Sequence, residues 1–249
     1  MSNKPVLLTR GTENYRDTAA LGALGIASVS EAFTKILPGK SEDAEHLLKS
    51  AEHANGWLVT TSRNSLTHWT QLVGEERLQQ TLLNNANLRF AAIGSGSAQT
   101  LIDIGITNIF TPTQTDSEDL LKDLNKFPPA DLVLPVGNLA RRTLADGLSQ
   151  AGWQVYSKVV YINQTTAVPT SIIEQIPTGF FSAIVLRSPS SVMALHCLVS
   201  NPLIPLICGG PITAQSAREL GLEIAGIASD PSPETLAALV SQILKEGAE

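Results

Sequence analysis

The chain has 249 residues, of which 43% are apolar, 16% charged and 5% aromatic, and this composition predicts one large or two modest domains that need no disulfide or metal ion. Its net charge of -6, without a dense Lys/Arg block, argues against a nucleic-acid partner, and its longest apolar runs are far shorter than the roughly 20 residues of a membrane-spanning helix. The N-terminal MSNKPVLLTRG lacks the apolar region of a signal peptide and the cysteines are few, so we expect a cytoplasmic protein.

Short β-rich runs alternate with helical patterns along the chain. We predict strands near 5–9, 26–32, 56–61, 88–93, 107–110, 130–135, 153–161, 181–186, 204–208 and 223–227. Helices are predicted to begin at the N-cap residues Ser41, Ser95, Ser117, Asn138, Ser188 and Asp230, and several to end at Gly25, Gly152 and Gly221. This alternation is typical of parallel α/β folds.

The chain also repeats itself. VLLTR, ending at Arg10, and LVLPVG, ending at Gly137, are each followed fifteen residues later by a helix-ending glycine, and the turn around Ser62 matches the turn around Ser188. The segments after Gly94 and Gly210 match as well, and so do SEDLLKDL and SPETLAAL. Two copies of one α/β unit therefore fill the chain.

Ten strands divide into two sheets of five. Each copy has a break after its first strand-helix-strand segment, at 38–40 and at 164–169. These breaks predict an exchange of segments: one lobe from 1–37 plus 167–249, a second from 38–166, and a two-stranded linker that joins them.

Four predicted turns at the carboxyl ends of strands are small and rich in hydroxyl groups: 60–62, 94–97, 188–191 and 209–213. Ligands of parallel sheets bind at such turns, where helix N-termini favour carboxylates or phosphates. Ordinary helix capping is the favoured explanation of any single turn, but two matched pairs favour an anion-binding cleft between the lobes.

Other ligand motifs are missing. GSGSAQ has Gln99 where a dinucleotide fingerprint has its third glycine, and no Walker lysine or G-x-S-x-G motif occurs. His46, His53, His68 and His196 lack metal-ligand spacing, so we interpret them as surface or hydrogen-bonded helical residues and expect no metal.

Arginines and one tyrosine are the remaining candidates. Arginines at or near the strand ends can clamp carboxylates, although Arg141 and Arg142 also fit solvated helix ends; the five are Arg10, Arg63, Arg141, Arg142 and Arg187. Tyr161 closes the run VVY just before the second linker. It can donate a proton or hydrogen bond there, or simply pack in the hinge.

Taken together, these segments resemble the uroporphyrinogen-III synthase family. The motifs are LLTR at 7–10, TTS at 60–62, AIGSGSAQTL at 92–101, LPVGNLARRTLADGLSQAGWQVYSKVVY at 134–161, RSPSSV at 187–192 and GPITAQSARELG at 210–221. The resemblance covers nearly the whole chain. It implies an α/β protein of two flavodoxin-like, doubly wound parallel-sheet lobes, related by duplication and joined by a two-stranded linker.

The resemblance also implies an activity. The family's substrate, hydroxymethylbilane, carries eight carboxylates and sits between the lobes. Hydroxide leaves to give an azafulvene, ring D is attacked through a spiro intermediate and emerges inverted, and no cofactor takes part. By resemblance, Tyr161 assists the departure of hydroxide, and Ser62, Ser97 and Thr213 are hydroxyl positions around the cleft.

The full set of expected substrate-binding residues comes from the strand-end turns of both copies: Thr9, Arg10, Thr61, Ser62, Arg63, Gly94, Ser95, Gly96, Ser97, Gly137, Asn138, Ser188, Pro189, Ser190, Gly210, Pro211 and Thr213. We expect a monomer that makes transient contact with hydroxymethylbilane synthase. A non-catalytic bilobal module that binds an anionic small molecule remains an open alternative at this point.

Overall fold

The chain forms two compact units. The computed structural model describes residues 4–10, 14–112 and 117–247. Unit 1 is discontinuous and consists of Met1–Lys35 and Gln164–Glu249, whereas unit 2 is the continuous segment Ile36–Asn163. The boundaries expected from the sequence lay at 37/38 and 166/167.

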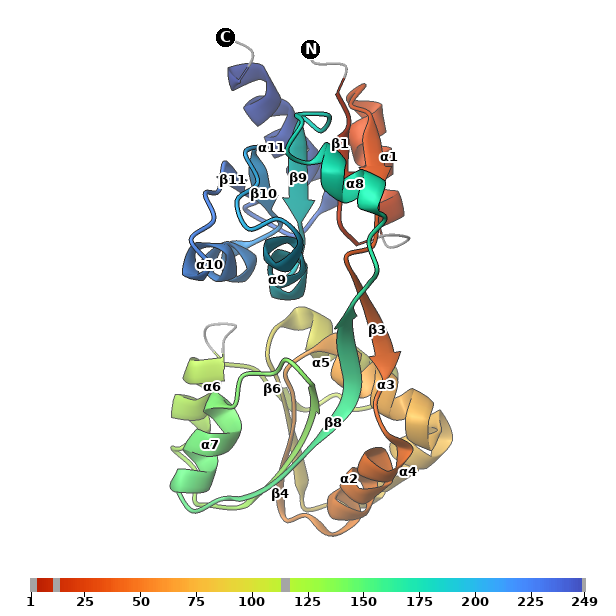
Figure 1. Ribbon diagram of the computed structural model, residues 1–249. Helices are drawn as coiled ribbons and strands as arrows, with labels where there is room; N and C mark the ends of the chain where they lie inside the picture. Colours follow the sequence, from red (N-terminus) through yellow and green to blue (C-terminus); the bar gives the residue numbers. More distant parts are fainter. Residues whose placement is uncertain (1–3, 11–13, 113–116, 248–249) are drawn as a thin grey trace. The chain divides into compact units, whose positions relative to one another are not determined.

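Unit 1 is built on a five-stranded parallel sheet of order β11-β10-β9-β1-β2. Its strands are β1 (Val6–Leu8), β2 (Ser28–Ser30), β9 (Ala183–Leu186), β10 (Leu206–Cys208) and β11 (Gly226–Ile227). Helices α1 (Tyr15–Ala23) and α11 (Pro233–Glu246) pack on one face, and α8 (Thr170–Gln175), α9 (Pro189–Leu198) and α10 (Pro211–Glu219) pack on the other (Figure 1). Helices on both faces make this unit doubly wound.

Unit 2 has a six-stranded sheet of order β3-β8-β7-β4-β5-β6. Its strands are β3 (Thr34–Pro38), β4 (Gly56–Thr60), β5 (Leu88–Ala92), β6 (Ile109–Phe110), β7 (Asp131–Gly137) and β8 (Gln154–Thr165). One face carries α2 (Ser41–His53), α3 (Arg63–Val73), α4 (Glu75–Asn84) and α5 (Ser95–Asp103), and the other carries α6 (Ser117–Leu124) and α7 (Thr143–Gln150) (Figure 1).

The expectation of two five-stranded sheets was wrong for unit 2. A break was expected at 38–40, but β3 ends there, and β8 continues beyond its expected end at residue 161 to Thr165. The Gly39 amide donates to the Val160 carbonyl at 2.9 Å, and the Thr166 amide donates to the Phe33 carbonyl at 3.0 Å. These bonds make β3 and β8 an antiparallel pair, the two-stranded linker along which the chain passes between the units.

The strand orders reveal the duplication. Within unit 1 the strands β1, β2, β9, β10 and β11 follow the order 2-1-3-4-5, counted along the chain. Apart from its edge strand β3, the sheet of unit 2 has the same order when β7 and β8 of the second copy are counted before β4, β5 and β6 of the first. Both units therefore have flavodoxin-like topology, each assembled from parts of both copies.

Most helix boundaries follow the local sequence. Gly25, Gly152 and Gly221 end their helices with φ of 72°, 89° and 73°, as predicted for left-handed caps. Four predicted N-caps were wrong, two of them by one residue, because the N-caps of α2 and α5 are Lys40 and Gly94 and not Ser41 and Ser95. Helix α7 begins only at Thr143, well after Asn138, and the N-cap of α11 is Ser232, whose amide is bound by the Asp230 carboxylate at 2.8 Å.

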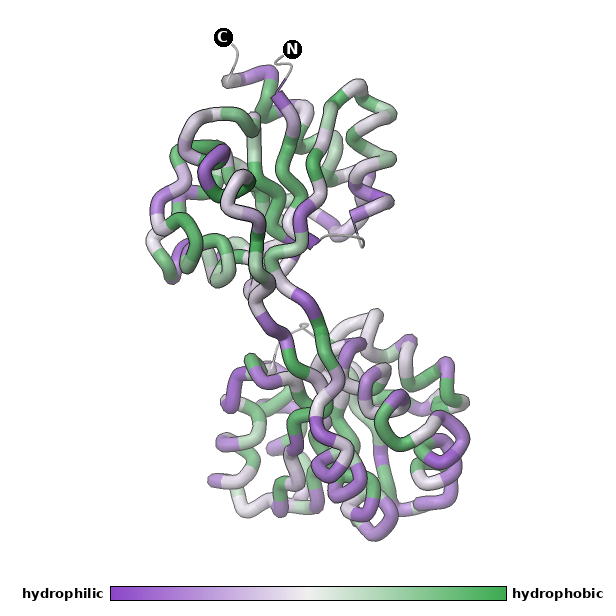
Figure 2. Tube along the Cα trace, turned by 45° about the vertical axis from the view of Figure 1, so that its right-hand side comes forward, coloured by the Kyte–Doolittle hydropathy of each residue, from purple (hydrophilic) through white to green (hydrophobic). Residues whose placement is uncertain are grey.

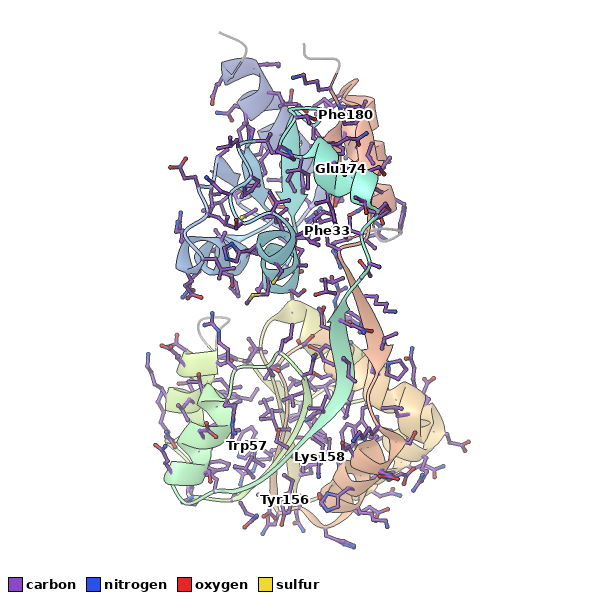
Figure 3. All side chains as sticks on the ribbon, viewed as in Figure 1. Phe33, Trp57, Tyr156, Lys158, Glu174 and Phe180 are labelled. Carbon is purple, nitrogen blue, oxygen red and sulfur yellow. The ribbon has the colours of Figure 1, made fainter. Side chains whose placement is uncertain are left out.

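Apolar residues pack on both faces of each sheet, and in Figure 2 hydrophilic residues recur along the helices. In unit 2, Trp57 of β4 packs toward α6 and α7, while its neighbour Leu58 packs toward α2 to α5 (Figure 3). Of the helices in the described ranges, none combines the length and apolar character that a membrane crossing needs.

Candidate functional site

Each sheet has a switch point where the strand order reverses, between β1 and β9 in unit 1 and between β7 and β4 in unit 2. Ligands of open α/β sheets bind at the carboxyl ends of the strands beside this point. In unit 1 those ends lead into Arg10 and Ser188, and in unit 2 into Asn138 and Ser62. The duplication thus gives both units equivalent candidate binding turns.

In unit 2, the turns after β4 and β5 lead into the N-termini of α3 and α5. The Ser62 hydroxyl is the N-cap of α3 and accepts from the Asn64 amide at 3.2 Å. Gly94 is the N-cap of α5 with φ 80° and ψ 161°, a conformation that is essentially restricted to glycine. A side chain at this position would strain the turn.

The Arg63 side chain joins these two N-termini. A Cβ at Gly96 would lie 3.1 Å from the Arg63 Cδ, so the exposed arginine of α3 lies over the first turn of α5. No hydrogen bond or ion pair ties it to another residue of the described ranges. A cation at a helix N-terminus opposes the helix dipole and adds to a potential that attracts anions.

Tyr161 lies against Gly137. A Cβ at Gly137 would come within 2.7 Å of the phenol oxygen and closer still to Cζ, so the tyrosine occupies the space that a side chain would need. The Asn138 amide donates to the Tyr161 carbonyl at 3.2 Å, and the Asn138 side chain is bonded to both backbone groups of Asn163. Asn138 therefore uses its amide to extend the β7–β8 pairing.

Unit 1 has helix N-termini equivalent to those of α3 and α5 in unit 2. Ser188 is the N-cap of α9 in a reciprocal capping box with Ser191, and Pro189 and Pro211 occupy first helical turns. Gly210 is the N-cap of α10, and Thr213 in its first turn is buried, as is its repeat partner Ser97 in α5. Of the remaining expected binding residues, Thr61 lies in the turn after β4, whereas Ser95 and Ser190 lie in the first turns of α5 and α9.

The side chains of two residues expected near the ligand have partners within unit 1. Arg187 was expected to clamp carboxylates, but its guanidinium is buried in a bidentate ion pair with Asp17 and also donates to the Pro231 carbonyl at 2.7 Å. The Thr9 hydroxyl donates to the Val185 carbonyl at 2.9 Å within the sheet. Both groups are occupied internally because β9, which is distant in sequence, pairs with β1 and meets α1.

The interpretation of the histidines was wrong for two of them. Neither His68 Nδ1 nor His196 Nδ1 has a hydrogen-bond partner within the described residues, although both atoms are buried. The His68 ring stacks on Tyr161, with ring centroids 5.8 Å apart. The sequence does not predict this contact, because α3 and β8 are far apart along the chain. Over the described ranges, no group of three His, Cys, Asp or Glu residues could hold a metal ion.

Comparisons with known proteins agree with this geometry. The family model "Uroporphyrinogen-III synthase HemD" matches residues 16–238. No curated protein sequence matches the chain.

Solved structures share the fold. A mutant uroporphyrinogen III synthase of Thermus thermophilus matches with TM-score 0.76 at 15% identity, covering 97% of this chain and 99% of that one. The wild-type Thermus thermophilus enzyme matches with TM-score 0.60 at 16% identity, covering 98% and 100%. The enzyme from Helicobacter pylori matches with TM-score 0.62 at 16% identity, covering 96% and 99%. Because the family model spans most of the sequence, the chain belongs to the uroporphyrinogen-III synthase family.

Proposed function

We propose that this chain is a lyase that cyclises hydroxymethylbilane to uroporphyrinogen III, with loss of water and inversion of ring D. The observation that carries the proposal is the family match over residues 16–238. The fold supports it, because two doubly wound units of the same strand order present matching sets of helix N-termini at their switch points. Such termini suit a substrate rich in carboxylates.

We further propose that carboxylates of the substrate bind the strand-end turns of both units. In unit 2 the support comes from Arg63, which lies over the α5 N-terminus without a protein partner in the described ranges. In unit 1 the support comes from the small turns before α9 and α10, where Ser188 and Gly210 cap the helices. Binding at several turns would fold the flexible chain so that ring D meets the reactive carbon, and positioning of this kind supplies several kcal/mol.

Tyr161 is the proposed general acid. Its phenol would donate a proton as the hydroxymethyl C–O bond breaks, so that water leaves and an azafulvene remains. Ring D then attacks the azafulvene through its substituted carbon and forms the spiro intermediate. The bond from that carbon to the methylene of ring C breaks, the free α-carbon of ring D bonds to this methylene instead, and the proton released on aromatisation restores the phenol. The half-buried position of Tyr161 beside Gly137, at the switch-point edge of unit 2, supports this role.

The test is to supply freshly made hydroxymethylbilane and to separate the oxidised type I and type III isomers. We expect predominantly type III product. Spontaneous closure gives type I, so protein that yields only type I is not a synthase. Protein that binds the bilane but leaves type I as the sole product would be the non-catalytic binding module.

We propose that the protein acts as a cytoplasmic monomer that receives its unstable substrate from hydroxymethylbilane synthase in a transient contact. Cys197 is exposed and Cys208 is buried, and both are free thiols, which suits a reducing compartment. Light scattering on the purified protein checks the monomer, and a dimer mass at micromolar concentration would contradict it.

A further inference from the structure

Buried polar atoms without partners gather on the α3 side of unit 2. Within the described residues, Thr60 Oγ1, Ser65 Oγ and His68 Nδ1 are buried and accept or donate no hydrogen bond. Thr60 ends β4 on the same face as Leu58, and Ser65 and His68 lie three residues apart on one side of α3. Unpaired buried polar groups cost stability, so the Nδ1 atom of His68 adds nothing to the fold.

The duplication supplies an internal comparison. Helix α9 of unit 1 corresponds to α3, with the N-caps Ser62 and Ser188 in equivalent places. At the same offset, Thr60 corresponds to Leu186 and His68 to Ala194, and both of these apolar residues are fully buried. The fold therefore accepts apolar residues at these positions, and the imidazole of His68 is not needed to build the unit.

His68 meets Tyr161. The two ring centroids lie 5.8 Å apart with an interplanar angle of 27°, a stacked arrangement. The phenol also lies against the backbone of Gly137. Tyr161 is thus restrained by a ring from α3 and by the backbone of β7.

The strand itself directs Tyr161 toward α3. Val136 pairs with Val159 but Gly137 pairs with Tyr161, so β8 carries one extra residue, Val160. Because of this bulge, both Val160 and Tyr161 pack on the face covered by α2 to α5, where strict alternation would have placed them on opposite faces. Bulges of this kind re-aim a side chain, here onto the His68 ring.

We propose that His68 is a positioning residue for the reaction: its imidazole ring stacks on Tyr161 and holds the phenol in the orientation from which it protonates the leaving hydroxide. His68 acts through Tyr161 and does not touch the substrate. The inference rests on the proposed function, because it assumes that Tyr161 is the general acid.

A double-mutant cycle tests this role. The variants are His68→Ala, Tyr161→Phe and the double variant, measured for kcat, KM and the fraction of type III product. His68→Phe keeps a ring in the stack without the nitrogens. His196→Ala is the matched control, because His196 on α9 also has a buried Nδ1 without a partner in the described residues but stacks on no tyrosine.

We expect His68→Ala to lower kcat about tenfold, with KM within twofold of wild type. When His68→Ala is added to the Tyr161→Phe enzyme, kcat should change less than twofold. His68→Phe should restore kcat to within about threefold of wild type, and His196→Ala should leave it unchanged. The proposal would be overturned if kcat of His68→Ala were unchanged, or if His68→Phe were as slow as His68→Ala. It would also be overturned if the losses in kcat of the two single variants multiplied in the double variant.

Folding is checked by thermal melting of every variant. If His68→Ala does not fold, His68→Leu fills the same space without a flat ring and takes its place in the cycle, with the same expected results. Wild-type protein that yields only type I product would instead overturn the proposed function, and the role of His68 with it.

Discussion

At Gly137 the backbone of β7 passes so close to the phenol of Tyr161 that a methyl group has no room. Gly137 is expected among the substrate-binding residues because it lies in a strand-end turn. The structure adds a second reason for glycine here, since the missing side chain leaves space for the tyrosine.

Tyr161→Phe removes the proposed proton donor and keeps the ring. We expect the formation of type III product to slow roughly tenfold to a thousandfold, the range of general acid catalysis. Steady-state assays with isomer separation measure this, and the melting temperature serves as the control for folding. Unchanged kinetics would leave Tyr161 a packing residue.

Gly137→Ala should displace the Tyr161 ring. We expect a kcat lowered to about that of Tyr161→Phe, and little further loss when both changes are combined, because both act on one phenol. The matched control is Gly22→Ala in α1, where a Cβ meets no atom within 4 Å. This control should keep full activity and raise the free energy of unfolding by about 0.5–1 kcal/mol. Full activity in Gly137→Ala would contradict the close contact.

The free energy of unfolding should depend on pH through the thiol of Cys208. Burial raises the pKa of the Cys208 thiol from its usual 9.0 to about 11, and the Arg218 charge opposes this only weakly. The unfolded thiol ionises at lower pH than the folded one, so its contribution to stability is complete below pH 9 and is lost as the pH rises toward 11. Denaturant titrations should show a steeper fall in the free energy of unfolding over this range than in Cys208→Ala. Parallel curves for the two proteins would show that the thiol is solvated.

At the scale of elements, the β8 strand does two things that its local sequence predicts only in part. Its apolar, β-branched run predicts a strand, but the extra residue at Val160 is set by pairing with β7. On β8, Tyr156 packs against the apolar cluster under α2 to α5, and Lys158 on the same face reaches Asp43 of α2 at 3.3 Å (Figure 3). The bulge then adds Tyr161 to this face.

Arg187 ties three elements of unit 1 together: β9, which it follows, α1 through Asp17, and the segment before α11 through Pro231. Arg187→Leu would leave the Asp17 carboxylate buried without a partner and should cost about 3–5 kcal/mol of unfolding free energy. Replacing both residues by leucine should recover much of this loss. Denaturant unfolding measures these differences.

The exposed pair of Arg142 and Asp146 is the control for Arg187. Arg142→Leu should change the free energy of unfolding by less than about 1 kcal/mol, as is usual for surface ion pairs. Equal effects of Arg142→Leu and Arg187→Leu would mean that burial of the Asp17 pair adds nothing.

At the scale of the whole molecule, unit 2 is one continuous segment between two crossings of the chain, whereas unit 1 needs both ends of the sequence. Unit 2 also has its own apolar cluster on each face of its sheet. We expect a protein of residues 36–163 to fold by itself and to unfold cooperatively, as seen by circular dichroism. A broad, non-cooperative transition would show that unit 2 depends on unit 1.

The sequence alone determined the class of fold, the duplication and the family resemblance. Strand and helix patterns, glycine caps and repeated turns are local features, and local features follow from backbone preferences and hydrophobic periodicity. The sequence did not predict the strand β3, because Pro38 and Gly39 are residues that usually mark a break between elements. Only its pairing with β8 makes it a strand.

Only the tertiary structure decided which polar groups are available. Arg187 and Thr9 look like ligand contacts in the sequence, but Asp17 and Val185 occupy them in the fold. His68 looks like an ordinary helical residue, but the bulge of β8 brings Tyr161 onto its ring. These outcomes depend on contacts between residues far apart in the chain, and no local pattern encodes such contacts.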